Sequence, residues 1–147
     1  AKEMVSAPIR LLEDAEETVK KLAVDYPLML VTKGDLFDQE SKIARSGLGD
    51  LFSHVEVVSK KDRATYEAII RRRGIDPSGF VMVGDSLRSD ILPVVDLGAH
   101  AIHVPYESTW RHEAVPDDVA SRYSFSRAAG IGEVPALLKK MGDESEK

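Results

Sequence analysis

The chain has 147 residues, of which 43% are apolar and 31% are charged, and its formal net charge is -5. This length and composition are typical of one ordinary globular domain. The acidic balance argues against nucleic acid as a main partner, because contacts to phosphate need a basic field. The sequence has no cysteine, and no apolar run in it approaches the ~18 residues of a membrane span. We therefore expect a cytoplasmic protein without disulfides or a membrane anchor.

Short apolar runs alternate with helical patterns along most of the chain. Apolar residues at helical spacing predict an amphipathic helix over residues 9–24. Residues 28–31 follow Pro27 and are apolar on both faces, as expected of a strand in a parallel sheet that helices cover on each side. A helix over residues 37–46, ended by two glycines, and a strand over residues 55–58 follow.

The second half of the chain continues the same alternation. Asp62 is suited to the N-cap and Gly74 to the C′ position of a helix that ends at Arg73. The remaining expected elements are strands over residues 80–83, 101–104 and 123–125, a helix from about 90 to 97, and a last helix over 134–141. We expect the folded part to cover residues 1–141, followed by a polar tail at residues 142–147.

Strands that alternate with helices predict an α/β fold, with a Rossmann-like parallel sheet and helices on both faces. In such sheets ligands bind outside the carboxyl ends of the strands. Three polar stretches follow predicted strands: Thr-Lys-Gly-Asp at residues 32–35, Ser-Lys-Lys-Asp at 59–62 and Gly-Asp-Ser at 84–86. We therefore expect hydroxyl, ammonium and carboxylate groups to meet at one edge of the sheet.

These groups suit the binding of a phosphoryl group. Thr32 and the backbone N–H groups near Lys33 and Gly34 can hold anionic oxygens, and a lysine from residues 59–62 adds a positive charge. Asp85, at a rigid strand end, suits a hard cation such as Mg²⁺. Asp90 would lie near the start of the next helix, from where it can orient the lysine or a metal-bound water.

Three quoted stretches carry a resemblance to a known family. They are LMLVTKGD, which holds Thr32, VVSKKD, which holds the paired lysines, and VMVGDSLRSDI, which holds Asp85 and Asp90. In this order they resemble the second, third and fourth motifs of the haloacid dehalogenase-like hydrolase superfamily, and the match covers about residues 8 to 106. The family often has Lys-Pro at the third motif, so that either Lys60 or Lys61 fits, and we prefer Lys61.

The resemblance implies a function and a set of site residues. The Gly-Asp-Ser form of the fourth motif looks like the Mg²⁺-dependent phosphatases of the superfamily. By that resemblance Thr32 and Lys61 would be catalytic, Asp85 and Asp90 would bind Mg²⁺, and the substrate would be a small phosphorylated metabolite. The phosphate monoester would be hydrolysed through an aspartyl-phosphate. Two alternatives are a non-catalytic binding or regulatory module with the same fold and a metal-free 2-haloacid dehalogenase.

The chain departs from the family at the first motif, Asp-x-Asp, which carries the nucleophile. No aspartate in the sequence has another aspartate two residues later, and the segment before Pro8 looks too short for a strand plus this motif. The sequence therefore predicts the C-terminal part of a family core, without the central nucleophile strand and without a cap. The sheet order would be 101–104, 80–83, a gap, 28–31 and 55–58.

A gap inside a sheet has an energetic consequence. Each buried N–H or C=O without a partner costs ~1–3 kcal/mol, so an empty slot would exceed the stability of an ordinary domain. We therefore expect an upstream segment or another chain to supply the central strand. We also expect the isolated chain to be inactive.

Overall fold

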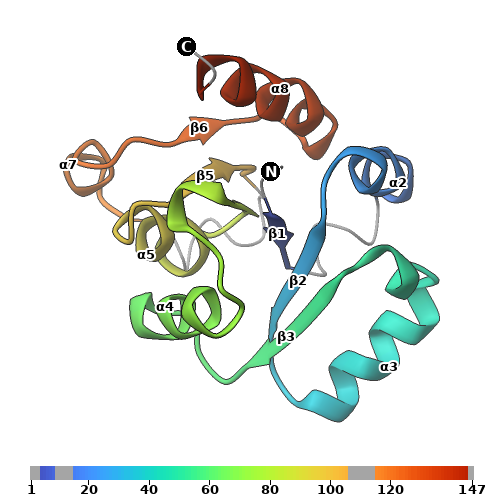
Figure 1. Ribbon diagram of the computed structural model, residues 1–147. Coiled ribbons are helices and arrows are strands. Elements are labelled where there is room, and N and C mark those ends of the chain that lie inside the picture. Colours follow the sequence, from blue (N-terminus) through green and yellow to red (C-terminus); the bar gives the residue numbers. More distant parts are fainter. Residues whose placement is uncertain (1–3, 9–14, 106–114, 146–147) are drawn as a thin grey trace.

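A six-stranded sheet forms the centre of the computed structural model, which describes residues 4–8, 15–105 and 115–145. The strand order is β3-β2-β1-β4-β5-β6, and every neighbouring pair is parallel (Figure 1). The predicted α/β fold with a Rossmann-like parallel sheet is confirmed. The strands are β1 (Met4–Ala7), β2 (Leu28–Lys33), β3 (His54–Val58), β4 (Phe80–Gly84), β5 (His100–His103) and β6 (Ser126–Arg127).

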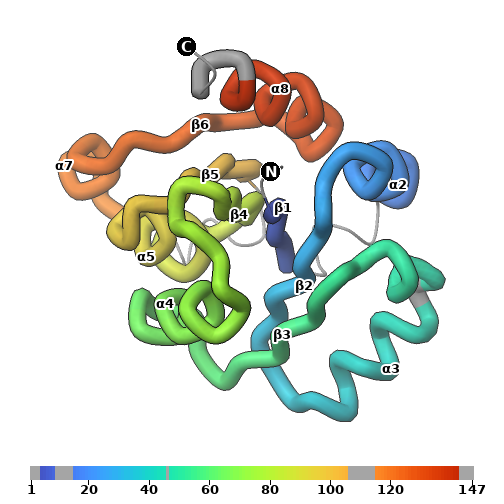
Figure 2. Tube along the Cα trace, viewed as in Figure 1, coloured from blue at the N-terminus to red at the C-terminus, as the bar shows by residue number. Residues whose placement is uncertain are grey.

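Helices cover both faces of the sheet, as Figure 2 shows along the Cα trace. Helices α2 and α8 pack on one face, where β2 directs Leu28 and Leu30, whereas α4 and α5 pack on the other face, where β2 directs Met29 and Val31. This alternation explains why the predicted strand is apolar on both sides. The helices are α2 (Glu16–Asp25), α3 (Leu36–Ser46), α4 (Arg63–Arg72), α5 (Leu92–Val95), α7 (Asp117–Ala120) and α8 (Val134–Ser145).

The predicted gap in the sheet is wrong, because β1 lies in the central position. Val5 is in register with Leu28 of β2 and with Val81 of β4, so that the backbone of this short strand pairs on both sides. Four residues are enough here because two neighbouring strands order them. The chain thus supplies its own central strand, and the backbone groups of β2 and β4 find partners without a further segment. Ser6 and Ala7 stand near its end, and β1 contains no aspartate.

Three predicted boundaries differ from the structure. The turn after β4 begins at Leu87 in a π-helical segment, η3 (Leu87–Ile91), because the Ser86 side chain caps it, whereas we expected a helix from about residue 90. The fifth predicted strand, residues 123–125, is wrong, and β6 lies just beyond it. Residues 142–145 continue α8, so the expected polar tail is partly helical.

The predicted N-cap at Asp62 is confirmed, and Asp35 caps α3 in the same way. Asp62 accepts a hydrogen bond from Thr65 N at 2.9 Å at the start of α4, and Asp35 accepts one from Asp38 N at 3.2 Å at the start of α3. Gly74 follows α4 with a φ of +67°, the left-handed conformation that favours glycine. The first predicted helix is found from Glu16 onward, and residues 9–14 lie outside the described residues. No described helix is long and apolar enough to span a membrane.

The last turn of α4 is tied to β3 by an ion-pair cluster. Arg72 and Arg73 contact the carboxylate of Glu56 at 2.5 and 2.9 Å, and the Glu56 side chain is only 10% exposed. Burial alone would raise the pKa of Glu56, but the two guanidinium groups outweigh burial and lower that pKa. The arginine run of α4 therefore has a structural partner in the sheet.

Candidate active site

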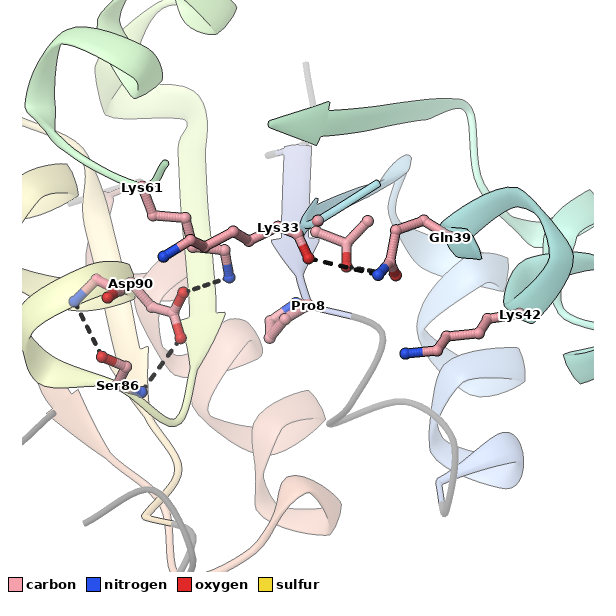
Figure 3. A pocket seen from close by; sticks show the side chains of 10 residues that line it. Pro8, Lys33, Gln39, Lys42, Lys61, Ser86 and Asp90 are labelled. Carbon is pink, nitrogen blue, oxygen red and sulfur yellow. Dashed lines mark hydrogen bonds and ion pairs between the residues drawn. The ribbon is translucent and has the colours of Figure 1, made fainter. Parts of the chain in front are cut away.

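A pocket of about 480 Å³ opens where β1, β2 and β4 end (Figure 3). This is the edge of the sheet at which the sequence predicted a ligand site. Of the residues predicted for substrate binding and catalysis, Thr32, Lys33, Gly34 and Lys61 line it, together with Asp90. The other lining residues are Pro8, Gln39, Lys42, Ser86 and Ser89.

The end of β2 is held in place by a side chain that the sequence did not single out. Thr32 is 4% exposed, and its hydroxyl donates to Gln39 Oε1 at 3.0 Å. The amide of Gln39 donates in turn to the Lys33 carbonyl at 3.4 Å. Gln39 thus fixes the orientation of the hydroxyl that faces the pocket. The signal in the sequence is its place one turn after the Asp35 cap, which turns Gln39 back toward the strand end.

Gly34 is required by its surroundings. Its φ is +142°, and a Cβ at this position would lie 2.8 Å from Gln39 Nε2. Its N–H donates to the Val58 carbonyl at 3.1 Å. Gly34 therefore allows the close approach of Gln39, and its N–H is used within the sheet edge rather than for a ligand.

A buried ion pair joins the third and fourth motif regions. Lys61 Nζ lies 2.8 Å from Asp90 Oδ1, and the two side chains are 8% and 1% exposed. The second oxygen of Asp90 accepts the Ser86 N–H at 3.1 Å. Burial raises the pKa of Asp90, and the Lys61 ammonium together with the Ser86 N–H opposes that rise. Asp90 is therefore the group that fixes Lys61 at the pocket wall.

Gly84 makes room for this pair. A Cβ at position 84 would lie only 2.6 Å from Asp90 Cγ, and nearer still to Asp90 Cβ. Any side chain here would displace the carboxylate that holds Lys61. The space that Asp90 occupies therefore explains why a glycine precedes Asp85 in the fourth motif region.

The choice between the two lysines has a geometric answer. Lys61 lines the pocket, whereas the side chain of Lys60 is 75% exposed and its Nζ lies 4.0 Å from Asp62. Lys60 borders a separate hollow between β3 and α4. Only Lys61 of the two is placed to meet a ligand at the strand ends.

Asp85 lies next to the pocket rather than among its lining residues. It follows β4, is 4% exposed, and its carbonyl lies 3.2 Å from Nε2 of His103. Because a carbonyl only accepts, Nε2 carries the proton of this imidazole. Burial lowers the pKa of His103, which keeps the ring neutral, and Phe125 packs edge-on against it at 6.2 Å. His103 thereby anchors the backbone at Asp85.

The predicted metal residues fit Mg²⁺ in part. Mg²⁺ takes oxygen ligands and keeps several waters, so that one or two protein carboxylates suffice for it. Asp85 has carboxylate oxygens of this kind at a rigid strand end beside the pocket, and both oxygens of Asp90 are engaged by Lys61 and Ser86. In the part of the chain that the structure describes, no three acidic or histidine side chains form a metal-binding group. The fit therefore rests on Asp85, with Asp90 supporting Lys61.

As far as the structure describes it, the end of the central strand adds no carboxylate to the pocket. Pro8 follows β1 and lines the pocket, and among the described lining residues Asp90 is the one carboxylate. Within the described residues, the position beyond β1 thus lacks the acid that the first family motif would place there.

Residues 1–98 match the family model for haloacid dehalogenase-like hydrolases, and the chain belongs to this family. Among curated proteins, the glyceraldehyde 3-phosphate phosphatase of Pyrococcus furiosus is 29% identical over 104 residues, which cover 67% of this chain and 43% of that protein. The matching phosphatase agrees with the phosphatase type that the fourth motif resembles.

Solved structures agree with the family. A haloacid dehalogenase-like hydrolase from Xanthomonas campestris is 37% identical, with a TM-score of 0.75 over 89% of this chain and 54% of that one. An uncharacterized protein from Listeria monocytogenes, 16% identical, shares the fold with a TM-score of 0.79 over 96% and 99% of the two chains. The chain thus spans about half the length of the Pyrococcus and Xanthomonas proteins.

Proposed function

We propose that this chain is part of a Mg²⁺-dependent phosphatase that hydrolyses a small phosphate monoester through an aspartyl-phosphate. The nucleophile would lie upstream of Ala1, on a strand that takes the central position of β1 in the full-length protein. The observation that carries the proposal is the convergence of Thr32 and Lys61 on one pocket at the carboxyl ends of parallel strands. An ammonium held by a buried carboxylate and a buried hydroxyl beside it suit a tetrahedral anion. The phosphatase from Pyrococcus furiosus supports the same reaction class.

Each residue has a defined part in this proposal. Lys61, fixed by Asp90 at 2.8 Å, donates its other N–H groups to the phosphoryl oxygens. Thr32 turns its hydroxyl from Gln39 toward a phosphoryl oxygen, and the Lys33 side chain adds a second ammonium at the pocket wall. A Mg²⁺ ion bound at Asp85 would supply further positive charge. His103 holds the Asp85 backbone in place for that role.

The missing first motif favours a second candidate, a non-catalytic binding module of the same family. The sequence contains no Asp-x-Asp, and β1 ends in Ser6 and Ala7 instead of an acid. The sequence upstream of Ala1 in the gene separates the two candidates. An Asp-x-Asp there after an apolar run supports the enzyme, and a start codon just before Ala1 supports the module.

Hydrolysis of p-nitrophenyl phosphate tests the proposal in the full-length protein, in this chain alone and in two variants of the full-length protein. We expect Mg²⁺-dependent turnover by the full-length protein and none by the chain alone. Asp85→Asn should remove most of the Mg²⁺-dependent rate, because it removes a ligand charge. Asp96→Asn is the matched control, because Asp96 is half-exposed and pairs with Arg63 on the surface.

Three results would contradict the proposal. Turnover by the chain alone that Asp85→Asn abolishes would place the nucleophile within these residues. An inactive full-length protein that still binds phosphate would favour the module. Unchanged Mg²⁺ dependence in Asp85→Asn would remove the metal role from Asp85.

A further inference from the structure

Lys42 lines the pocket but has no part in the phosphate site proposed above. Resting on the phosphatase function proposed above, we propose that the substrate carries a second anionic group at the end remote from its phosphate, and that Lys42 binds this group. Lys42 is a specificity-determining residue in this proposal. It lies on α3, outside the motif regions that hold the phosphate.

The charge balance of the lining residues is the first observation. Among the described residues, three lysines line the pocket, Lys33, Lys42 and Lys61, against one carboxylate, Asp90. Lys61 and Asp90 neutralise each other at 2.8 Å, which leaves two ammonium groups. The excess contrasts with the whole chain, which has 25 acidic and 20 basic residues. This local positive charge attracts an anionic ligand, and the two ammonium groups belong to separate elements, β2 and α3.

The lack of a protein partner for Lys42 is the second observation. Some basic side chains elsewhere in the chain form pairs, such as Lys20 with Glu16 and Arg71 with Glu67 one turn apart on their helices. Within residues 4–8, 15–105 and 115–145, no ion pair or side-chain hydrogen bond is found for Lys42. Its ammonium is thus available to a ligand.

The position of Lys42 is the third observation. It lies three residues after Gln39, so that both side chains stand on the same face of α3. The Asp35 cap and the bond from Thr32 to Gln39 fix that face toward the strand ends. Figure 3 shows the Lys42 side chain reaching toward Pro8 from the side of the pocket opposite Lys61 and Asp90.

These positions define the class of substrate. A phosphate held between Thr32 and Lys61 leaves the rest of a small molecule to extend past Pro8 toward Lys42. A pocket of about 480 Å³ accommodates a metabolite of a few carbons with charged groups at both ends. Phosphorylated carboxylic acids and bisphosphates have this form. A phosphorylated alcohol or aldehyde would leave Lys42 without an anionic partner.

Calorimetric titration with two ligands tests the proposal on this chain in Mg²⁺ buffer. 3-Phosphoglycerate and glycerol 3-phosphate share the phosphate and the three-carbon length, and differ in a carboxylate against a hydroxymethyl group. We expect 3-phosphoglycerate to bind about three- to tenfold more tightly, the range of one partly exposed charge-assisted hydrogen bond. Lys42→Gln should remove this preference and leave the affinity for glycerol 3-phosphate unchanged.

Lys60→Gln is the matched control, because it removes the same charge from outside the pocket and should keep the preference. Equal affinities for the two ligands in the wild type, or a preference that Lys42→Gln does not change, would overturn the role of Lys42. The phosphate pocket would stand in that case, since both ligands still bind. Failure of both ligands to bind would instead overturn the proposed phosphatase site itself, and with it the second subsite.

Discussion

Removing the ammonium of Lys61 should destabilise the chain and make its stability depend on pH. In Lys61→Met the Asp90 carboxylate, 1% exposed, loses its cationic partner at 2.8 Å and keeps the hydrogen bond from the Ser86 N–H. Breaking one side of a buried ion pair costs about 3–5 kcal/mol when the remaining charge stays buried. This range bounds the effect from above, because Asp90 can take up a proton.

The sign of the pH dependence follows from the same carboxylate. Burial already raises the pKa of Asp90, and loss of Lys61 removes the main force that opposes the rise. A carboxyl whose pKa is raised on folding favours the protonated folded state, so its contribution is present at low pH and is lost as pH rises through the raised pKa. The cost of Lys61→Met relative to wild type should therefore be larger at about pH 7.5 than at about pH 5.

Urea unfolding at the two pH values measures these costs, provided that the m-values of the variants agree. Lys60→Met is the control, because its side chain is 75% exposed and its substitution should cost less than about 0.5 kcal/mol. If Lys61→Met costs no more than Lys60→Met at both pH values, Lys61 and Asp90 do not form a buried pair.

Two other predictions concern the packing around the site and the edge of the sheet. Gly84→Ala should lower the free energy of unfolding in urea by about 1–3 kcal/mol, because its Cβ would collide with Asp90. Gly79→Ala is the control and should lower it far less, because a Cβ there meets open space. Equal losses in the two variants would refute the steric explanation. The folded state lowers the pKa of Glu56, so this carboxylate stabilises the fold above its unfolded pKa and loses that effect as pH falls. In Glu56→Gln the free energy of unfolding should therefore fall less steeply with decreasing pH than in the wild type. A Glu56→Gln variant that loses stability as steeply as wild type between about pH 5 and pH 3 would contradict the pairing with α4.

The sheet was predictable where local patterns decide the structure. Residues 28–31 and 80–83 are apolar at every position because each strand feeds both layers of the core, with Phe80 and Met82 on one face and Val81 and Val83 on the other. In an α/β chain, short runs that are apolar at every position are best explained as buried parallel strands. The polar residues after them could then be placed at one edge, and Thr32, Lys61 and Asp90 do converge there.

The central strand was not predictable from its own residues. Met4–Ala7 is four residues long and holds the polar Ser6 in the middle of a short apolar pattern. Its strand conformation comes from pairing with β2 and β4, which are distant in sequence. Ser6 is fully buried, and its hydroxyl is directed at Val81 O at 3.4 Å and at the Met82 sulfur at 3.0 Å. The hydrophobic pattern of a segment does not reveal pairing partners that are distant in sequence.

The contribution of α3 to the pocket was missed for a different reason. The sequence predicts the helix but not its rotation about its own axis, which the Asp35 cap sets. Positions 35, 39 and 42 are four and three residues apart, so they share one face of the helix. With the cap recognised, Gln39 and Lys42 could have been assigned to the side that faces Thr32.

Binding of orthophosphate to this chain tests the central claim most directly, because it needs neither the nucleophile nor turnover. Calorimetric titration in Mg²⁺ buffer should show binding by the wild type and by Thr32→Ser, which keeps the hydroxyl. Binding by Thr32→Val should be about tenfold weaker, since a hydrogen bond to a charged ligand is lost. Wild-type protein that binds no phosphate, or Thr32→Val that binds it as well as Thr32→Ser, would contradict a phosphate site at the end of β2.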